Sequence, residues 1–423
     1  MEGAIVEVVI AHEINYYERY KVLLSLMRWN WQQPDWPKFT WNRSRLARAE
    51  QQFLIGAGTL IGAVKHLDGE ERSQITVEAI STEAVTTAEI EGEILDRASV
   101  QSSIRRQFGL ATDNRRVGPA EQGMAEMMVD LYRSFSVPLS GEMLFAWHRM
   151  LVGGRRDLKD VGRYRTSGEP MQVVSGAIHE PKVHFEAPPS SHVESEMGRF
   201  IAWFNRTGPG NGEPLPALTR AGMAHLHFEC IHPFEDGNGR IGRALAEKSM
   251  AQSIGQPTLT ALSATILAKR KSYYEALEAA NKQNEITAWL AWFAGVAIEA
   301  QRRTTALVEF LIDKARLLDG LRGQLNQRQE KALLRMLREG PEGFAGGLSA
   351  GKYATITGAS PATATRDLVE LVTKGALIRT GERKHTRYQL SIPLRSVTSV
   401  VVNERGEVKP AAASYPSQSG RPQ

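Results

Sequence analysis

The residues best suited to chemistry lie in one short segment, 232–243, which reads His-Pro-Phe-Glu-Asp-Gly-Asn-Gly-Arg-Ile-Gly-Arg. Gly237 and Gly239 can adopt a positive φ and leave room for a ligand to approach the backbone. The N–H groups of such a turn, together with those that begin the next helix, form a binding site for an anion. The segment therefore predicts a phosphate-binding loop.

The charged side chains around this loop suit a polyphosphate. Arg240 and Arg243 are three residues apart, so on a helix they share one face beside the loop. Asp236 offers the hard oxygen ligand that a phosphate-bound Mg²⁺ prefers, and Asn238 offers an amide donor to a phosphate oxygen. His232 is the one residue of this segment whose side chain has an ordinary pKa suited to a general base near neutral pH.

Helices are expected to position the loop. Apolar residues at three- and four-residue spacing predict helices over 216–231 and 241–254, on either side of it. The same spacing predicts helices over 42–65, 73–95, 122–135, 140–151, 192–206, 263–281 and 286–319. Residues 171–185 are the exception, because apolar residues around Gly176 and Pro181 predict a short β-hairpin. The fold class that follows is mainly α.

The 232–243 segment resembles the signature of the Fic family, His-x-Phe-x-Asp/Glu-Gly-Asn-Gly-Arg-x-x-Arg, at every specified position. The loop resembles the AMP-transferring branch rather than the related Doc branch, and the resemblance covers roughly 97–295. It implies that His232 deprotonates a Ser, Thr or Tyr hydroxyl of a target protein, which attacks the α-phosphorus of ATP. It also implies that Asp236 holds Mg²⁺ and that Asn238 and the loop amides stabilise the α-phosphate.

Two further segments fit the same family. Residues 162–178 resemble the flap, a hairpin that covers the nucleotide and pairs with the main chain of the target; a plain surface hairpin is the alternative. Tyr273, Tyr274 and Asn281 match the adenine-contacting residues in type and spacing, although such a tyrosine pair is often core packing. The implied nucleotide-binding residues are Val174, Ser175, Gly176, Ala177, Gly237, Asn238, Gly239, Arg240, Arg243, Tyr273, Tyr274 and Asn281.

Upstream, residues 86–92 resemble the inhibitory motif of Fic proteins, Ser/Thr-x-x-x-Glu-Gly/Asn, with Thr87, Glu91 and Gly92 at the specified positions. The resemblance implies that Glu91 pairs with Arg243, the arginine otherwise available to the γ-phosphate. ATP would then bind with its α-phosphorus out of line for attack. In some relatives the same carboxylate activates a water that removes AMP, so one site could run in both directions.

The C-terminal region predicts a second module. Residues 327–339, 349–357 and 361–374 read as helices and 376–390 as two strands, which is the outline of a winged helix-turn-helix. Its expected wing is basic and suits phosphate contacts, through Lys374, Arg379, Arg383, Lys384, His385 and Arg387. A solvated or protein-binding module explains the same pattern. Residues 392–423 end in Pro, Ser, Gly and Ala and are expected to be disordered.

Bulk composition limits the class of protein. The 423 residues are 42% apolar and 23% charged, which is typical of soluble globular proteins. One cysteine, Cys230, excludes an intrachain disulfide and fits a reducing compartment, so we expect a cytoplasmic protein with no membrane partner. The tryptophan-rich stretch 28–41 resembles a domain of unknown function that precedes Fic cores. One hypothesis is that Met27 is the true start.

These observations divide the chain into six parts. They are a non-native extension at 1–26, an N-terminal helical domain with the inhibitory helix at 27–96, a Fic core at 97–295, a linker helix at 296–325, a winged helix at 326–391 and a disordered tail at 392–423. The favoured function is an autoinhibited protein adenylyltransferase that uses ATP and an unidentified target protein. The alternative is a DNA-binding regulator with the Fic core as a nucleotide sensor. Self-modification, a homodimer and transfer of another nucleotide stay open.

Overall fold

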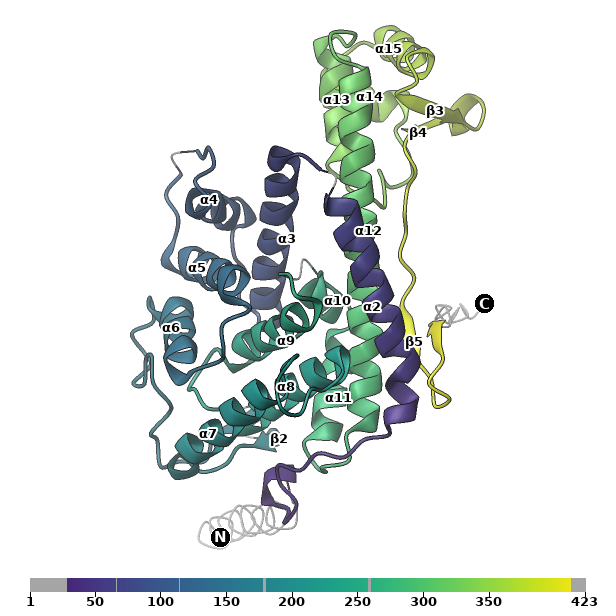
Figure 1. Cartoon of the computed structure of the whole chain (residues 1–423). Helices are drawn as coiled ribbons and strands as arrows, with labels where there is room; N and C mark the ends of the chain where they lie inside the picture. The colour runs from purple at the N-terminus through teal and green to yellow at the C-terminus, as the bar shows by residue number, and fades with distance from the viewer. Residues whose placement is uncertain (1–28, 66, 114, 178–179, 258–259, 412–423) are drawn as a thin grey trace, which may run out of the picture.

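The computed structural model describes residues 29–65, 67–113, 115–177, 180–257 and 260–411 (Figure 1). The N-terminal part contains η1 (Asn30–Gln32), α2 (Arg43–Lys65), α3 (Gly69–Ile90), α4 (Arg97–Gln107), α5 (Pro119–Ser134) and α6 (Gly141–Val152). The middle contains β1 (Gln172–Ala177), β2 (Glu180–Glu186), α7 (Ser190–Arg206), α8 (Ala217–Ile231), α9 (Asn238–Ile254), α10 (Leu262–Ala268), α11 (Arg270–Ala280) and α12 (Thr287–Gly320). The C-terminal part contains α13 (Gln327–Leu337), α14 (Ala350–Thr357), α15 (Pro361–Thr373), β3 (Leu377–Thr380), η2 (Arg383–His385), β4 (Arg387–Leu390), β5 (Val400–Val402) and β6 (Val408–Pro410). The prediction of a mainly helical fold with a short hairpin is confirmed.

Helix α8 is the central element of the fold and is buried along almost its whole length. One side of it places Leu226 and Cys230 in a core shared with α12. The other side places Phe228 and Ile231 in a core shared with α5, α6 and α7. A helix that is apolar on all sides is stable only inside a protein. The loop that follows α8 is therefore held by packing on both sides.

Helix α12 is longer than the core and carries the C-terminal module. It packs beside α2, and its far end projects away from α8 and α11 toward α13, α14 and α15 (Figure 1). Val296, Val308 and Phe310 of this helix are buried. The domain boundary expected at residue 296 therefore does not correspond to any break in the helix. None of the described helices is both long enough and apolar enough to cross a bilayer.

Two helical predictions need correction. The single helix expected over 263–281 is divided into α10 and α11 at Lys269, whose φ of −120° is not helical. Helix α4 was not predicted, because its sequence is polar and carries several arginines and serines. Only its buried face, which includes Val100 and Ile104 four residues apart, has the apolar spacing of a helix.

The prediction of disorder from residue 392 onward was wrong for 392–411. Strands β5 and β6 pair with each other, and Val400 and Val402 are buried in the α8–α12 core. The Val400 N–H also donates to Oε2 of Glu299, a fully buried carboxylate of α12, at 3.0 Å. Apolar burial and this hydrogen bond offset the ordering entropy that the surrounding small and polar residues alone could not. The expected extension at 1–26 and residues 412–423 lie outside the described residues.

Candidate active site

The loop after α8, the β1–β2 hairpin and α11 enclose a cavity of about 720 Å³. Cavities of about 300–1,000 Å³ are typical of small-molecule and cofactor sites. Most of the predicted site residues line this cavity, namely Glu91, Val174, Ser175, His232, Asp236, Gly237, Asn238, Gly239, Tyr273, Tyr274 and Asn281. Elements that are distant in the sequence thus line one cavity, as expected if the loop binds a nucleotide there.

His232 ends helix α8 in a left-handed conformation, with φ of 50° and ψ of 60°. Its backbone N–H still donates to the Phe228 carbonyl at 3.0 Å, while its Nδ1 lies 3.3 Å from the Glu229 carbonyl oxygen. A proton on Nδ1 leaves the Nε2 lone pair free to accept another. Burial lowers the pKa of His232 to about 4, despite the nearby carboxylates of Glu91 and Asp236. The imidazole is therefore neutral at physiological pH.

Arg165 braces the backbone around His232, and its sequence position gave no sign of this role. Its Nε donates to the His232 carbonyl at 2.8 Å, and its Nη2 donates to the Pro188 carbonyl. Its own N–H donates to the Pro233 carbonyl at 2.9 Å. Burial lowers the pKa of Arg165 to about 10, which still leaves it charged near neutral pH. The loop is thus tied to the segment that follows the hairpin.

Within the loop, Gly237 has a φ of 85°, as predicted, whereas Gly239 lies in the first turn of α9 and has no positive φ. The Asn238 side chain bridges the loop, because its Nδ2 donates to the Phe234 carbonyl and its Oδ1 accepts from the Phe234 N–H. The amide predicted to contact a phosphate is thus already engaged in shaping the turn. Asp236 accepts from Arg240 at 3.0 Å and from Arg155 at 2.9 Å. Arg155 is a second contact that the sequence did not reveal.

The segment that resembles the inhibitory motif reaches Arg243, whose side chain is almost fully buried. Its Nε and Nη2 donate to the hydroxyl and the carbonyl of Thr87, at 2.7 and 2.8 Å. Its Nη1 forms an ion pair with Oε1 of Glu91 at 2.7 Å, without the alignment of a hydrogen bond. A Cβ at Gly239 would lie 2.2 Å from the same carboxylate oxygen. The absence of a side chain at Gly239 therefore lets Glu91 lie against the loop.

A second carboxylate reinforces this contact. Gly92, with a φ of 85°, reverses the chain after α3, so that the Glu93 N–H returns to the Ala88 carbonyl. Glu93 then pairs with Arg240 at 2.6 Å. The end of α3 thus engages both arginines of the loop through alternate residues, and only the Glu91 contact was expected from the motif.

Comparison with known proteins supports one family. Residues 138–250 match the model of the Fic/DOC family, and residues 29–110 match that of a domain of unknown function, DUF4172. The chain carries a Fic/DOC domain. A protein adenylyltransferase Fic of Nematostella vectensis is 30% identical over 134 residues, which are 32% of this chain and 27% of that protein. Protein adenylyltransferase fic-1 of Caenorhabditis elegans is 28% identical over 143 residues, 34% of this chain and 24% of that protein. The chain spans about a quarter of the length of these curated relatives.

Solved structures resemble the chain at lower identity. A Fic family protein from Desulfovibrio desulfuricans G20 is 21% identical and covers 81% of this chain and 95% of its own, with a TM-score of 0.45. A Fic domain-containing signaling protein from Bacteroides thetaiotaomicron VPI-5482 is 19% identical and covers 62% of this chain and 98% of its own, with a TM-score of 0.48.

A buried carboxyl lies in the Fic/DOC domain between the catalytic histidine candidate and the inhibitory contact. Glu229 lines the cavity, and its Oε1 has no hydrogen-bond partner among the described residues. Burial raises the pKa of Glu229 to about 8; the charge of Glu91 adds to this and that of Arg243 opposes it. Glu229 is therefore mostly protonated at neutral pH, and the ion pair of Arg243 is with Glu91.

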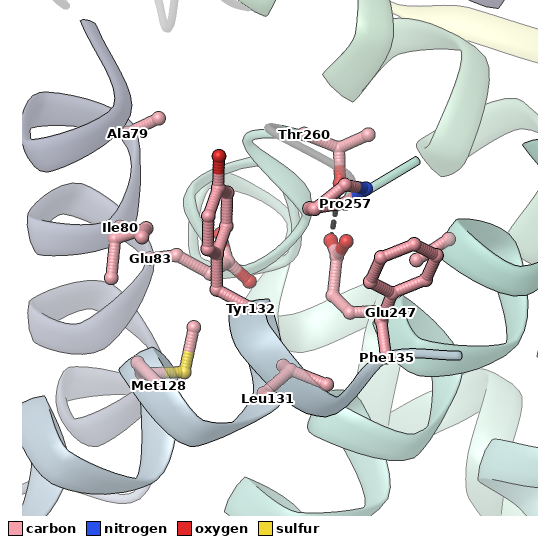
Figure 2. A pocket seen from close by; sticks show the side chains of 11 residues that line it. Ala79, Ile80, Glu83, Met128, Leu131, Tyr132, Phe135, Glu247, Pro257 and Thr260 are labelled. Carbon is pink, nitrogen blue, oxygen red and sulfur yellow. Dashed lines mark hydrogen bonds between the residues drawn. The ribbon is translucent and has the colours of Figure 1, made fainter. Parts of the chain in front are cut away.

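Helix α3 is anchored to α10 through Glu83, which Figure 2 shows beside Tyr132 and opposite Glu247. Glu83 of α3 accepts from the Ser263 N–H at the start of α10, at 2.8 and 3.0 Å. Beside it lies a small cavity of about 30 Å³, on whose other side Glu247 of α9 is bonded to the Thr260 hydroxyl. Burial, and then the charge of Glu247, raise the pKa of Glu83 to about 8. The inhibitory helix is thus fixed against α9 and α10.

Some of the predicted adenine-contacting residues at α11 pack in the core, and others face the cavity. Tyr273 is 1% exposed and its hydroxyl bonds to His225, so it is mainly a core residue. Tyr274 is partly exposed and donates to the Ile90 carbonyl at 3.2 Å. Asn281 donates to the His184 carbonyl at 3.3 Å, whereas its buried Oδ1 has no partner among the described residues. An acceptor of this kind suits an amino group of a ligand.

The hairpin predicted as a flap forms at the expected position. Strands β1 and β2 pair antiparallel, with a register shift between Val173 and Val174. Val174 and Ser175 are exposed toward the cavity, and the backbones of Gly176 and Ala177 continue the strand. The N-terminal tryptophan-rich segment supports the hairpin, because Trp31 Nε1 donates to the Glu186 carbonyl at 2.7 Å. The expected flap residue Ile178 lies outside the described residues.

Proposed function

We propose that this chain is a protein adenylyltransferase that transfers AMP from ATP to a hydroxyl of a Ser, Thr or Tyr side chain. The observation that carries the proposal is the meeting of His232 and the glycine turn 237–239 around one cavity, whose wall also includes Glu91, the ion-pair partner of the buried Arg243. The Fic/DOC domain and the similarity to protein adenylyltransferases support this activity class. The cavity is also large enough for a nucleotide.

The reaction follows from the proton state of His232 and from the loop. The neutral imidazole would take the proton of the target hydroxyl, whose oxygen then forms a bond to the α-phosphorus of ATP. The bond between that phosphorus and the oxygen bridging to the β-phosphate breaks, and pyrophosphate leaves. The N–H groups of Asn238 and Gly239, in the first turn of α9, would stabilise charge on the nonbridging oxygens, which is the main demand of phosphoryl-type transfer.

A metal ion fits this site only as a partner of the phosphates. The described residues contain no group of three or more His, Cys, Asp or Glu side chains placed to hold an ion. Asp236 is a single, one-third exposed carboxylate on the cavity wall. Mg²⁺ commonly binds proteins through one or two carboxylates and takes substrate phosphates as further ligands. Asp236 would hold the Mg²⁺ that accompanies ATP, whose chemical contribution is to neutralise phosphate charge.

The adenine end of the cavity supports ATP as the nucleotide. The unpartnered Oδ1 of Asn281 can accept from the exocyclic amine of adenine, and Tyr274 offers a ring on the same side of α11. A guanine base carries a carbonyl at the corresponding position, which would leave two acceptors facing each other. We therefore assign the preference for adenine to Asn281.

The resting state would be inhibited by Glu91. Its carboxylate neutralises Arg243, which otherwise has a free edge for the γ-phosphate. A triphosphate that cannot reach Arg243 binds in a different position, in which its α-phosphorus is not aligned with the hydroxyl that His232 deprotonates. The same carboxylate, once a modified target is bound, could orient a water for AMP removal. Both directions would then use one cavity.

The test is transfer from ATP labelled at the α-phosphate into the proteins of a cell lysate. Glu91→Gly should label more strongly than wild type, and Glu91→Gly/His232→Ala should lose about 10²–10⁴-fold, as for loss of a general base. Glu89→Gly is the matched control, because it puts a glycine into the same turn of α3 without touching Arg243. Equal labelling by wild type and Glu91→Gly, or full labelling without His232, would contradict the proposal.

A specific charge distribution favours duplex DNA binding as a second function. Residues 326–391 contain 11 Lys and Arg against 6 Asp and Glu, a net charge of +5 that equals that of the whole chain. Helices α14 and α15 are joined through Gly358 in the left-handed conformation and precede the β3–β4 hairpin, as in a winged helix-turn-helix. This region lies at the far end of α12 from the catalytic cavity (Figure 1).

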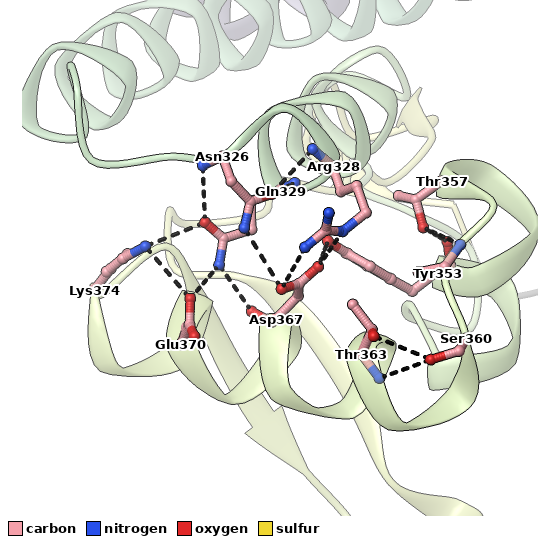
Figure 3. Close-up of polar contacts among 11 residues, drawn as sticks. Asn326, Arg328, Gln329, Tyr353, Thr357, Ser360, Thr363, Asp367, Glu370 and Lys374 are labelled. Atoms are coloured by element: carbon pink, nitrogen blue, oxygen red, sulfur yellow. Dashed lines mark hydrogen bonds and ion pairs between the residues drawn. The ribbon is translucent and has the colours of Figure 1, made fainter.

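Two acidic side chains of this module, Asp367 and Glu370, are engaged by other residues of the module (Figure 3). Asp367 is buried and accepts from Arg328 at 2.8 Å and from the Tyr353 hydroxyl at 3.0 Å. Arg366 of α15 and Arg383 at the hairpin tip are exposed and form no ion pair with another described residue. The surface that α15 and the hairpin present is therefore cationic, which suits a phosphate backbone.

Fluorescence anisotropy of the full chain with a labelled DNA duplex at two salt concentrations tests this second function. Binding should weaken as salt rises, and Arg366→Ala/Arg383→Ala should reduce both the affinity and the salt dependence. Arg322→Ala, at an exposed arginine outside the module, is the control. No binding at low salt, or loss of AMP transfer to one target only, would favour a protein-docking module instead.

A further inference from the structure

Three side chains on the wall of the catalytic cavity form a continuous hydrogen-bonded chain. The Ser175 Oγ of β1 lies 2.6 Å from Nε2 of His184 in β2. Nδ1 of the same ring lies 2.7 Å from Oε2 of Glu278 in α11. All three residues line the cavity that also contains His232 and the glycine loop. The proposed mechanism uses none of these contacts.

The order of the three side chains determines which atom donates and which accepts in each hydrogen bond. A carboxylate only accepts hydrogen bonds, so in the neutral imidazole the proton lies on Nδ1 and Nε2 accepts from the Ser175 hydroxyl. Burial raises the pKa of Glu278, but the His184 contact and the charges of Lys282 and Lys182 outweigh it and lower that pKa below its ordinary value. A serine, a base and an orienting carboxylate in this sequence are the arrangement of an activated nucleophile.

The chain is held in place and faces the cavity. Asn281 Nδ2 donates to the His184 carbonyl at 3.3 Å, and Lys182 lies 3.6 Å from Glu278. The strand that carries the base is therefore fixed to α11 by contacts that do not involve Ser175. The His184–Glu278 pair would fasten the hairpin without a serine. The His184–Glu278 contact therefore does not need Ser175 to hold the hairpin, and the exposed Ser175 hydroxyl is available to react.

We propose that Ser175 is a self-modification site, which takes AMP from the ATP bound in its own cavity. This inference rests on the proposed adenylyltransferase function, because the α-phosphorus of ATP is the electrophile that the function brings there. The Ser175 Oγ–phosphorus bond forms, the bond from that phosphorus to the β-phosphate bridge breaks, and pyrophosphate leaves. The hydroxyl proton passes to Nε2 of His184, and Glu278 holds the resulting imidazolium.

The site is tested by incubating the purified full-length Glu91→Gly protein with ATP and Mg²⁺ and locating AMP by peptide mass spectrometry. We expect AMP on the peptide that contains Ser175, and its loss in Glu91→Gly/Ser175→Ala. Ser167→Ala, at an exposed serine in the loop before the hairpin, is the matched control and should leave the Ser175 modification unchanged. The same sample is mixed with a lysate to measure transfer to other proteins.

Two failures are distinguishable. If lysate proteins or other residues of the chain acquire AMP and Ser175 does not, the self-modification inference is wrong and the proposed function stands. If no protein acquires AMP, the proposed function itself fails.

The role of His184 has its own test. Glu91→Gly/His184→Gln keeps a hydrogen-bonding side chain but lacks the base, and Ser175 modification should fall by about 10²-fold or more. Glu91→Gly/His232→Ala should retain Ser175 modification while losing transfer to lysate proteins, because each acceptor has its own base. Loss of Ser175 modification without His232, or its persistence in His184→Gln, would overturn His184 as the base.

Discussion

Oε1 of Glu91 lies 2.7 Å from Nη1 of Arg243, so the residue that directly follows helix α3 neutralises a buried arginine of α9. Arg243 is 1% exposed, and its remaining nitrogens are bound to Thr87. A buried guanidinium needs a counter-charge, and a carboxylate or a phosphate can serve equally. Regulation of the proposed activity therefore becomes competition between two anions for one cation.

The Glu93–Arg240 pair predicts a second, weaker restraint. Glu93→Gln keeps the side-chain volume but removes the charge that faces Arg240 at 2.6 Å. We expect transfer by Glu93→Gln to lie between that of wild type and Glu91→Gly, because Glu93 faces Arg240 and leaves the proposed γ-phosphate partner Arg243 paired with Glu91. Initial rates with α-labelled ATP measure this. Glu70→Gln, at the far end of α3, should match wild type, and a Glu93→Gln rate equal to wild type would remove Glu93 from the inhibitory device.

The pKa of His232 predicts an acid limb at unusually low pH. Burial lowers this pKa to about 4, and a general base is active only while it is neutral. The kcat/KM of Glu91→Gly should therefore stay level as pH falls from about 8 to about 5 and decline only as the pH approaches 4. Circular dichroism at each pH separates this limb from acid unfolding. A midpoint near the ordinary histidine value of about 6.5 would contradict the burial argument.

The buried carboxyl of Glu229 predicts a pH-dependent stability difference. Its pKa in the folded protein is raised to about 8, so the unfolded chain binds fewer protons there than the folded chain between about 4.5 and 8. The wild type loses stability across that window relative to Glu229→Gln, which cannot ionise. The Tm advantage of Glu229→Gln should be small near pH 4.5 and should grow toward pH 8. Glu275→Gln, at an exposed glutamate of α11, should show no such trend; a flat difference for Glu229→Gln would contradict the assignment.

Arg155 predicts a dependence on magnesium. It is an exposed arginine that lies 2.9 Å from the carboxylate of Asp236, the proposed metal ligand. Arg155→Ala frees Oδ2 of this carboxylate while Arg240 still binds Oδ1, so half-maximal transfer in a Glu91→Gly background should require less Mg²⁺ at fixed ATP. Arg156→Ala, at the exposed neighbouring arginine, is the control. An unchanged or higher Mg²⁺ requirement in Arg155→Ala would show that the two groups do not compete.

Much of the catalytic region could be predicted from sequence, because its function depends on residues close together in the chain. The turn at Gly237, the hairpin over 171–185 and the helices on either side of the loop follow from local patterns. The contact between Glu91 and Arg243 could be predicted only from a family motif, because the 151 residues between them carry no geometric information about it. Local spacing alone would not have brought these two side chains together.

The missed features are long-range contacts without a local signature. Arg165, Arg155 and Glu93 are ordinary charged residues in the sequence, and only tertiary structure places them on the loop. Strand β5 was overlooked because it is short and because the burial of two of its three valines, Val400 and Val402, depends on packing against α12. The Ser175–His184–Glu278 hydrogen bonds join two strands to a helix about a hundred residues away, and the sequence of neither strand indicates them.

Label position is the most direct measure of the central claim. Glu91→Gly protein is incubated in parallel with ATP labelled at the α-phosphate and with ATP labelled at the γ-phosphate, together with a lysate. The account predicts that protein acquires the α-label, that the γ-label leaves as pyrophosphate, and that Glu91→Gly/His232→Ala transfers neither to the lysate. Incorporation of the γ-label would indicate kinase chemistry, and incorporation of neither label by Glu91→Gly would contradict the account outright.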